Sequence, residues 1–176
     1  FLVDSLGQQV FPSFIDIYEQ PLLRQAMGSS AYDSEGVATS TRNIVEAGTV
    51  QGYVLSSYSA RKLGMQSTAN AGGVHNLTIK PGDLDFQGLL KEMNTGLLVT
   101  ELIGQGVNTL TGDYSRGATG FWVENGEIQF PVEEVTIAGN LKDMFQSVIA
   151  VGNDVDLRGN TRTGSILLSE MTLAGN

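Results

Sequence analysis

The sequence predicts an α+β fold that is rich in β-structure, with a largely antiparallel sheet or barrel and a few short helices. Glycine makes up 22 of the 176 residues and is spread along the chain, which is typical of many turns between short elements. Two tight-turn signals, Ala47-Gly48 and Asn125-Gly126, each separate β-compatible segments. Hydrophobic residues at 41% and charged residues at 16% lie near globular averages, so the chain is long enough to bury a core.

The first half of the chain predicts a hairpin followed by two helices. Residues 39–56 alternate polar and branched side chains on either side of Ala47-Gly48, which indicates two paired strands. Residues 57–62 predict a short helix that Ser56 or Ser57 caps and Gly64 ends. A second helix is expected over residues 85–94.

The second half predicts strands and a third helix. Residues 97–103 form an apolar, β-compatible run, and Asn125-Gly126 indicates a hairpin over residues 121–130. Asn140 is expected to cap a helix over residues 141–148, whose apolar side chains fall on one stripe.

A seven-residue segment recurs near the end of the sequence. EVTIAGN at residues 134–140 returns as EMTLAGN at residues 170–176. We interpret the two copies as sheet strands with similar exits, although an internal duplication is the alternative.

Charge and composition exclude several function classes. Ten Lys and Arg against 19 Asp and Glu give a net charge of −9, which argues against affinity gained by neutralising phosphates. One His and no Cys cannot build a Cys₄ or Cys₂His₂ zinc site or a two-His peptidase helix, and they exclude thiol catalysis and disulfides. The chain begins at Phe1, so we expect a piece of a longer protein, and these exclusions apply to this piece alone.

Short motifs elsewhere favour structural roles. Ser59 and Lys62 match S-x-x-K, in which a lysine activates a serine, but the accompanying motifs are absent and a solvated helix end is favoured. Segments beginning at Asp83 and Asp154 imitate a calcium loop but lack its twelfth-position glutamate. We therefore interpret both as turns.

The glycine-rich segment over residues 104–120 is the main candidate site. It is predicted to be a loop, and Tyr114 and Arg116 lie within it. Arg116 can clamp a carboxylate and Tyr114 can stack and donate a hydrogen bond. The alternative is an internally satisfied loop with Arg116 paired to Asp113 or Glu101. His75 follows a flexible Gly72-Gly73 segment, where a hydrogen-bonded structural histidine is favoured over a groove-lining one.

Long strings of the sequence resemble the TldD/PmbA family, in its PmbA branch, which is also called TldE and "modulator of DNA gyrase". The strings are SYSARKLG at 57–64, AGGVHN at 71–76, KEMNTGLLVTELIGQGVN at 91–108 and TGDYSRGATGFWVENGEIQFPVEEVTIAGNLKDM at 111–144. They match the carboxy-terminal part of a protein more than twice as long. The resemblance implies that residues 1–176 form a single carboxy-terminal domain whose amino-terminal half is absent.

The resemblance also implies a function within a larger assembly. Two sister subunits of the family form a cytoplasmic zinc metallopeptidase that acts on unfolded or leader-type peptides, and the zinc ligands belong to the TldD-type sister. This chain resembles the PmbA sister, so we expect no catalytic residue and no metal ligand in it. Its expected partners are the TldD-type sister or a second copy of itself, and not nucleic acid or a membrane.

Peptide binding is the role that the resemblance leaves to this chain. Family members bind peptide as an extended strand in a cavity between subunits, and strand addition tolerates varied sequences. We hypothesise that Tyr114 and Arg116 contact the peptide, with His75 as a third contact. The alternative is a self-associating peptide- or protein-binding scaffold for which the gyrase label is indirect.

Overall fold

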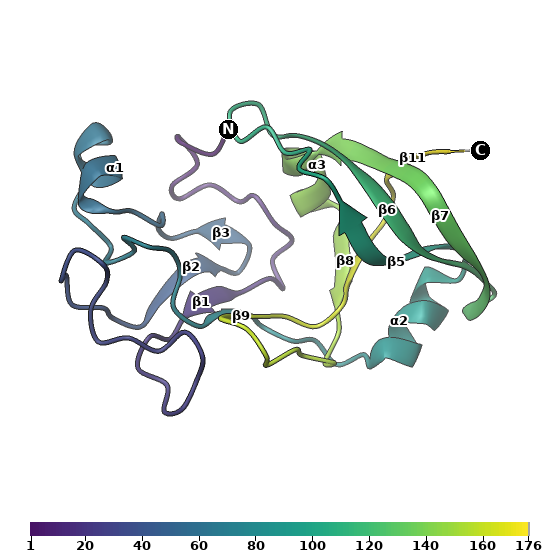
Figure 1. Ribbon diagram of the computed structural model, residues 1–176, viewed down its shortest axis with the longest axis horizontal. Coiled ribbons are helices and arrows are strands. Elements are labelled where there is room, and N and C mark those ends of the chain that lie inside the picture. The colour runs from purple at the N-terminus through teal and green to yellow at the C-terminus, as the bar shows by residue number, and fades with distance from the viewer. Residues whose placement is uncertain (176) are drawn as a thin grey trace. The chain divides into compact units, whose positions relative to one another are not determined.

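The computed structural model describes residues 1–175, and they divide into two compact units (Figure 1). Among the described residues, unit 1 contains residues 1–4, 82–153 and 165–175. Unit 2 contains Ser5–Pro81 and Asp154–Gly164. Each unit has its own β-sheet structure and its own buried side chains.

Unit 2 is built on a five-stranded sheet in the order β3-β2-β1-β4-β9. Its strands are β1 (Ile17–Glu19), β2 (Arg42–Glu46), β3 (Thr49–Val50), β4 (Leu77–Ile79) and β9 (Thr161–Arg162). The pairs are antiparallel except β4 with β9, which run parallel. The buried hydrophobic side chains of this unit are Ile15, Val45, Val50, Leu55, Ala60, Ala69 and Ala71.

The predicted hairpin around Ala47-Gly48 is confirmed as β2 and β3, although the returning strand is shorter than predicted. Ala47 and Gly48 have positive φ angles of 47° and 76°, which this tight turn requires. A Cβ at Gly48 would lie 2.3 Å from the carbonyl oxygen of Phe11, so only glycine fits there.

The first predicted helix is also confirmed, as α1 (Ser57–Lys62). Ser56 is the N-cap and forms a reciprocal capping box with Ser59. Arg61 and Lys62 lie in the last turn, and Gly64 follows with a φ of 66°.

Unit 1 contains a four-stranded antiparallel sheet in the order β11-β7-β6-β5 and a two-stranded sheet of β10 and β8. Its elements are α2 (Phe86–Met93), β5 (Gly96–Ile103), β6 (Asp113–Glu124), β7 (Glu127–Asn140), α3 (Leu141–Gln146), β8 (Val148–Val151), β10 (Ile166–Leu168) and β11 (Thr172–Ala174). Over residues 1–175 the sheets are largely antiparallel and none closes on itself. Of the two predicted arrangements, the antiparallel sheet is therefore confirmed, and a closed barrel is not found among these residues.

The Asn125-Gly126 hairpin is confirmed as the long pair β6 and β7, which are neighbours in Figure 1. Asn125 and Gly126 have φ angles of 53° and 75°, as the favoured two-residue hairpin turn requires. The Gly126 amide donates to the carbonyl of Asn94, the C-cap of α2, at 2.8 Å. The helix predicted over residues 85–94 is confirmed as α2, with Asp85 and Asn94 as its caps.

Two predictions about unit 1 are wrong in part. The segment 104–120 was expected to be a loop, but residues 113–120 form the first part of β6. Glycine is needed in this strand because a Cβ at Gly120 would lie 1.8 Å from the carbonyl oxygen of Leu98 on β5. The helix expected over residues 141–148 ends at Gln146, because Ser147 is its C-cap and Val148 begins β8.

The two copies of the repeated segment pair with each other. The first copy forms the end of β7 and the second contains β11, and the register is Thr136 with Ala174, Ile137 with Leu173 and Ala138 with Thr172. Equivalent residues therefore exchange places across an approximate local two-fold axis. The prediction that both copies are sheet strands is confirmed.

Candidate peptide-binding site

Strand β6 brings Tyr114 and Arg116 to the same face of the unit 1 sheet, because residues two apart on a strand point to the same side. Tyr114 is half-buried and packs against the core cluster of Ala118, Val135 and Ile137. The aromatic ring is thus held by packing at the beginning of the strand.

A hollow of about 330 Å³ lies beside Tyr114. Its lining consists of Gln105, Gly106, Val107, Asn108, Asp113, Tyr114 and Ser115. The Ser115 amide donates to the carbonyl of Gly106 at 2.7 Å, and the Asn108 amide donates to the carbonyl of Asp113 at 2.8 Å. These bonds hold the wall of the hollow against β6.

Glycine is obligatory at residue 106 in this wall. A Cβ there would lie 1.4 Å from the carbonyl oxygen of Ser115, so any other residue would push the loop away from β6. The glycine at this position therefore permits a close approach of backbone between two parts of the chain.

Arg116 does not form either of the ion pairs considered from the sequence. Its Nη2 donates to the carbonyl of Leu102 at 3.2 Å, and its buried Nε has no hydrogen-bond partner among residues 1–175. The Asp113 carboxylate instead accepts from the Thr111 hydroxyl at 2.6 Å and from Asn140 Nδ2 at 3.1 Å. The Arg116 guanidinium thus retains donors beyond its one backbone bond.

His75 lies in unit 2 and is tied into local structure. Its Nε2 lies 3.2 Å from the carbonyl oxygen of Ala69, and its backbone amide donates to Glu19 Oε1 at 2.6 Å. These contacts support the hydrogen-bonded structural role. The structure therefore brings Tyr114 and Arg116 together on one strand and places His75 in the other unit.

The loop that carries His75 rests on a buried ionic network that sequence reasoning missed. Glu19 is 2% exposed, and its Oε2 lies 3.2 Å from Arg42 Nε. Asn70 Nδ2 donates to Glu19 Oε1 at 2.7 Å, and Arg42 Nη2 donates to Asn70 Oδ1 at 2.7 Å. Because β1 and β2 are short and meet only through long-range pairing, no local pattern in the sequence could have indicated these partners.

A second buried carboxylate, Asp33, organises the neighbouring turn. It is 4% exposed and accepts from the backbone amides of Glu35, Val37 and Ala71. Burial raises the pKa of the Asp33 carboxyl, but these three hydrogen bonds and the nearby His75 lower it by more, so it stays below its ordinary value of 3.8.

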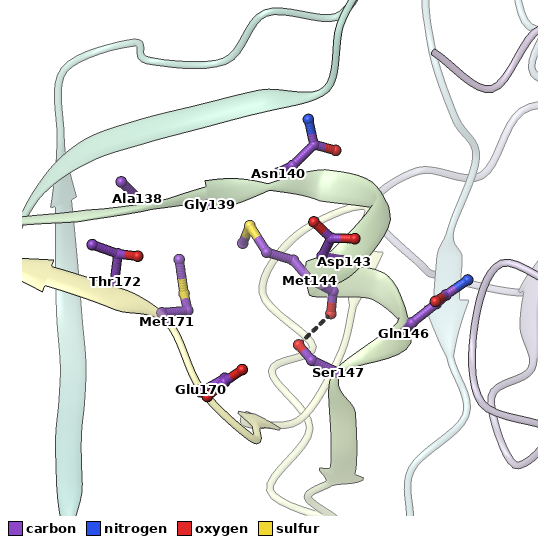
Figure 2. A pocket seen from close by; sticks show the side chains of 10 residues that line it. All are labelled: Ala138, Gly139, Asn140, Asp143, Met144, Gln146, Ser147, Glu170, Met171 and Thr172. Atoms are coloured by element: carbon purple, nitrogen blue, oxygen red, sulfur yellow. Dashed lines mark hydrogen bonds between the residues drawn. The ribbon is translucent and has the colours of Figure 1, made fainter.

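The larger hollow of unit 1, about 570 Å³, was not predicted (Figure 2). It lies where the end of β7, helix α3 and the beginning of β11 meet, and the repeated segment contributes to it from both copies. Its lining consists of Ala138, Gly139, Asn140, Asp143, Met144, Gln146, Ser147, Glu170, Met171 and Thr172. The repeat was the sequence signal that could have drawn attention to it.

The described residues do not fit a zinc centre. Over residues 1–175 no three His, Cys, Asp or Glu side chains come together in a way that could hold a metal ion. Among these residues there is also no helix with the length and hydropathy needed to cross a membrane.

Ser59 and Lys62 do not form a nucleophile and base pair. The Ser59 hydroxyl bonds to the backbone of Ser56 as part of the capping box, and Lys62 Nζ lies 5.0 Å from the centroid of the Tyr58 ring. Both side chains therefore have the structural roles that the sequence favours.

The β-rich α+β fold and the sequence of this chain are those of a known protein family. The sequence model described as "PmbA/TldA metallopeptidase C-terminal domain" matches residues 1–175, and the chain belongs to this family.

Two similar proteins carry the PmbA name. The chain is 57% identical over 175 residues to the metalloprotease PmbA of Escherichia coli O157:H7, covering 99% of this chain and 39% of that protein. It is 56% identical over 177 residues to a metalloprotease PmbA homolog of Haemophilus influenzae, covering 100% of this chain and again 39% of the relative. The chain thus spans about two fifths of the length of these relatives.

Solved structures agree with the fold. A Bacteroides thetaiotaomicron protein described as a candidate modulator of DNA gyrase superposes with a TM-score of 0.92 at 33% identity, over 100% of this chain and 40% of that one. TldE from Thermococcus kodakarensis superposes with a TM-score of 0.82 at 26% identity, over 99% of this chain and 42% of that one. The PmbA, TldE and gyrase-modulator names expected from the sequence are thus all carried by similar proteins.

Proposed function

We propose that the chain is the carboxy-terminal domain of a PmbA/TldE-type subunit, which joins a TldD-type sister in a cytoplasmic zinc metallopeptidase for unfolded or leader-type peptides. The zinc belongs to the sister subunit. This chain supplies no catalytic residue and serves in assembly and in peptide binding.

One observation carries the proposal. The chain is 57% identical to a protein called a metalloprotease, yet it has one His and no Cys, and residues 1–175 assemble no metal-ligand set. A domain of a metallopeptidase family without ligands of its own fits a subunit that shapes the substrate while another supplies the metal.

The hollow beside Tyr114 supports peptide binding. Its size of about 330 Å³ suits one or two side chains, and the Arg116 guanidinium on the same strand face has donors available for a peptide carbonyl or carboxylate. We place the peptide along the 104–112 loop and the β6–β7 hairpin that ends near Gly126. His75 is kept as a third proposed peptide contact.

The main test is reconstitution of the full-length protein with its TldD-type sister. We expect peptide hydrolysis only in the mixture, its loss on addition of a chelator, and its return with Zn²⁺. An inactive mixture would favour the alternative, a self-associating peptide- or protein-binding scaffold. Chelator-resistant activity of this subunit alone would instead indicate a metal-independent hydrolase.

Peptide contact is tested by a double substitution that preserves packing. Tyr114 packs on the core, so Tyr114→Phe with Arg116→Met removes the hydroxyl and the guanidinium without opening a large cavity. We expect KM of the reconstituted pair to rise about thirtyfold, since the two lost hydrogen bonds contribute about 1 kcal/mol each, with a smaller change in kcat. An unchanged KM would remove these two residues from the peptide site.

A further inference from the structure

We propose that the 570 Å³ hollow between β7, α3 and β11 is a subsite for a lysine or arginine side chain of an extended peptide that lies along the open edge of β11. The inference rests on the proposed peptide-binding function and adds a second contact region, which selects basic residues. It is carried by the lining of the hollow, by its unpaired carboxylates and by the neighbouring sheet edge.

The floor of the hollow is apolar and deformable. Met144 points into it from α3, and Met171 points into it from the position just before β11 (Figure 2). Both side chains approach Gly139, where an added Cβ would lie 3.4 Å from Met144 Cγ and 4.0 Å from Met171 Cε. The missing side chain at Gly139 leaves space, and unbranched thioethers accommodate the aliphatic stem of a long side chain.

The rim of the hollow is acidic. Asp143 and Glu170 line it, both are exposed, and neither carboxylate has a hydrogen bond or ion pair within residues 1–175. The lining contains no Lys, Arg or His. A basic side chain would therefore meet two carboxylates at the end of an apolar stem, which matches the shape and charge of lysine and arginine.

Strand β11 provides the place for the peptide backbone. It is the outermost strand of its sheet and pairs only with β7 in the described chain. All three of its residues are exposed, and Thr172 also lines the hollow. An extended segment can add to such an edge through backbone hydrogen bonds while one side chain enters the hollow.

The test measures binding of short labelled peptides to the full-length protein by fluorescence anisotropy. The peptides alternate valine and threonine and carry lysine, norleucine or glutamate at the centre. Norleucine keeps the stem of lysine without its charge. We expect lysine to bind about tenfold more tightly than norleucine and glutamate to bind most weakly, with the lysine preference shrinking as salt is raised.

Two double variants assign any preference to this hollow. Asp143→Asn with Glu170→Gln should abolish the lysine preference and leave norleucine binding unchanged. Glu92→Gln with Glu133→Gln removes the same charge from exposed positions outside the hollow and should keep the preference. Equal binding of lysine and norleucine peptides, or a preference that survives in the first variant, would overturn the subsite. Failure of all three peptides to bind would instead count against peptide binding itself.

Discussion

At the scale of single residues, the stability of unit 2 depends on Glu19. This carboxylate is 2% exposed and accepts hydrogen bonds from Arg42, Asn70 and the His75 amide. Glu19→Gln leaves the Arg42 guanidinium without its counter-charge and sets an amide donor against other donors. We expect the free energy of unfolding to fall by about 2–4 kcal/mol in urea denaturation.

A matched control for this change lies on the neighbouring strand. Glu46 of β2 is exposed and has no side-chain hydrogen bond or ion pair within residues 1–175. Glu46→Gln should change the free energy of unfolding by less than about 0.5 kcal/mol. If both substitutions lowered the free energy of unfolding equally, the hydrogen bonds and the ion pair of Glu19 would contribute no stability beyond the effect of removing one negative charge.

The Asp33 carboxyl makes the stability of unit 2 depend on pH, and the direction of its pKa shift fixes the sign of this dependence. Its pKa is lowered in the folded chain, so its contribution to stability is fully present above the ordinary value of 3.8 and is lost as pH falls through the folded pKa. We expect Asp33→Asn to be less stable than the unmodified protein at neutral pH, with a difference that shrinks as the pH is lowered below about 4. Urea midpoints across this range measure it, and a difference that grows on acidification would contradict it.

At the scale of elements, the β6–β7 hairpin depends on its turn. Gly126 has a φ of 75°, and a Cβ there would lie 2.9 Å from Lys91 Cα of α2. Gly126→Ala therefore strains the turn and displaces α2, and we expect it to lower the free energy of unfolding by about 1–3 kcal/mol. Asn125→Gly at the preceding position keeps the turn type and should be tolerated, as urea denaturation would show. Similar losses for both would argue that contact with α2 is unimportant.

Elements that a turn or cap motif of a few residues marks could be predicted from the sequence. Strands that depend only on pairing with distant residues could not. The Asn125-Gly126 turn and the Ser56 cap act over a few residues, so the hairpin and α1 are visible in the sequence. Strand β1 is three residues long and depends on pairing with distant β2 and β4, so no local pattern identifies it. Residues 113–120 were expected to be part of a loop because glycine is dense over residues 104–120, whereas in the structure the glycines of this part allow close contacts between strands.

The candidate site was predictable only in part, for the same reason. Tyr114 and Arg116 were identified because they stand in an unusual local composition. The hollow between β7, α3 and β11 is assembled from residues about thirty positions apart, and only the pairing of the two repeat copies brings Asn140 and Glu170 to the same hollow. Long-range strand register creates that hollow, and register cannot be read from either copy alone.

At the scale of the whole chain, the net charge of −9 argues against direct DNA binding. This expectation can be tested because a similar protein is called a modulator of DNA gyrase. Proteins gain affinity for duplex DNA mainly by neutralising phosphates with clustered Lys and Arg, and Arg61-Lys62 is the only adjacent basic pair in the sequence. We expect residues 1–176, tested alone, not to change the fluorescence anisotropy of a labelled duplex, even at about 0.05 M salt, where phosphate contacts are strongest. Salt-sensitive binding that is lost in Arg61→Gln with Lys62→Gln would contradict this expectation and place the DNA contact on α1 of this chain.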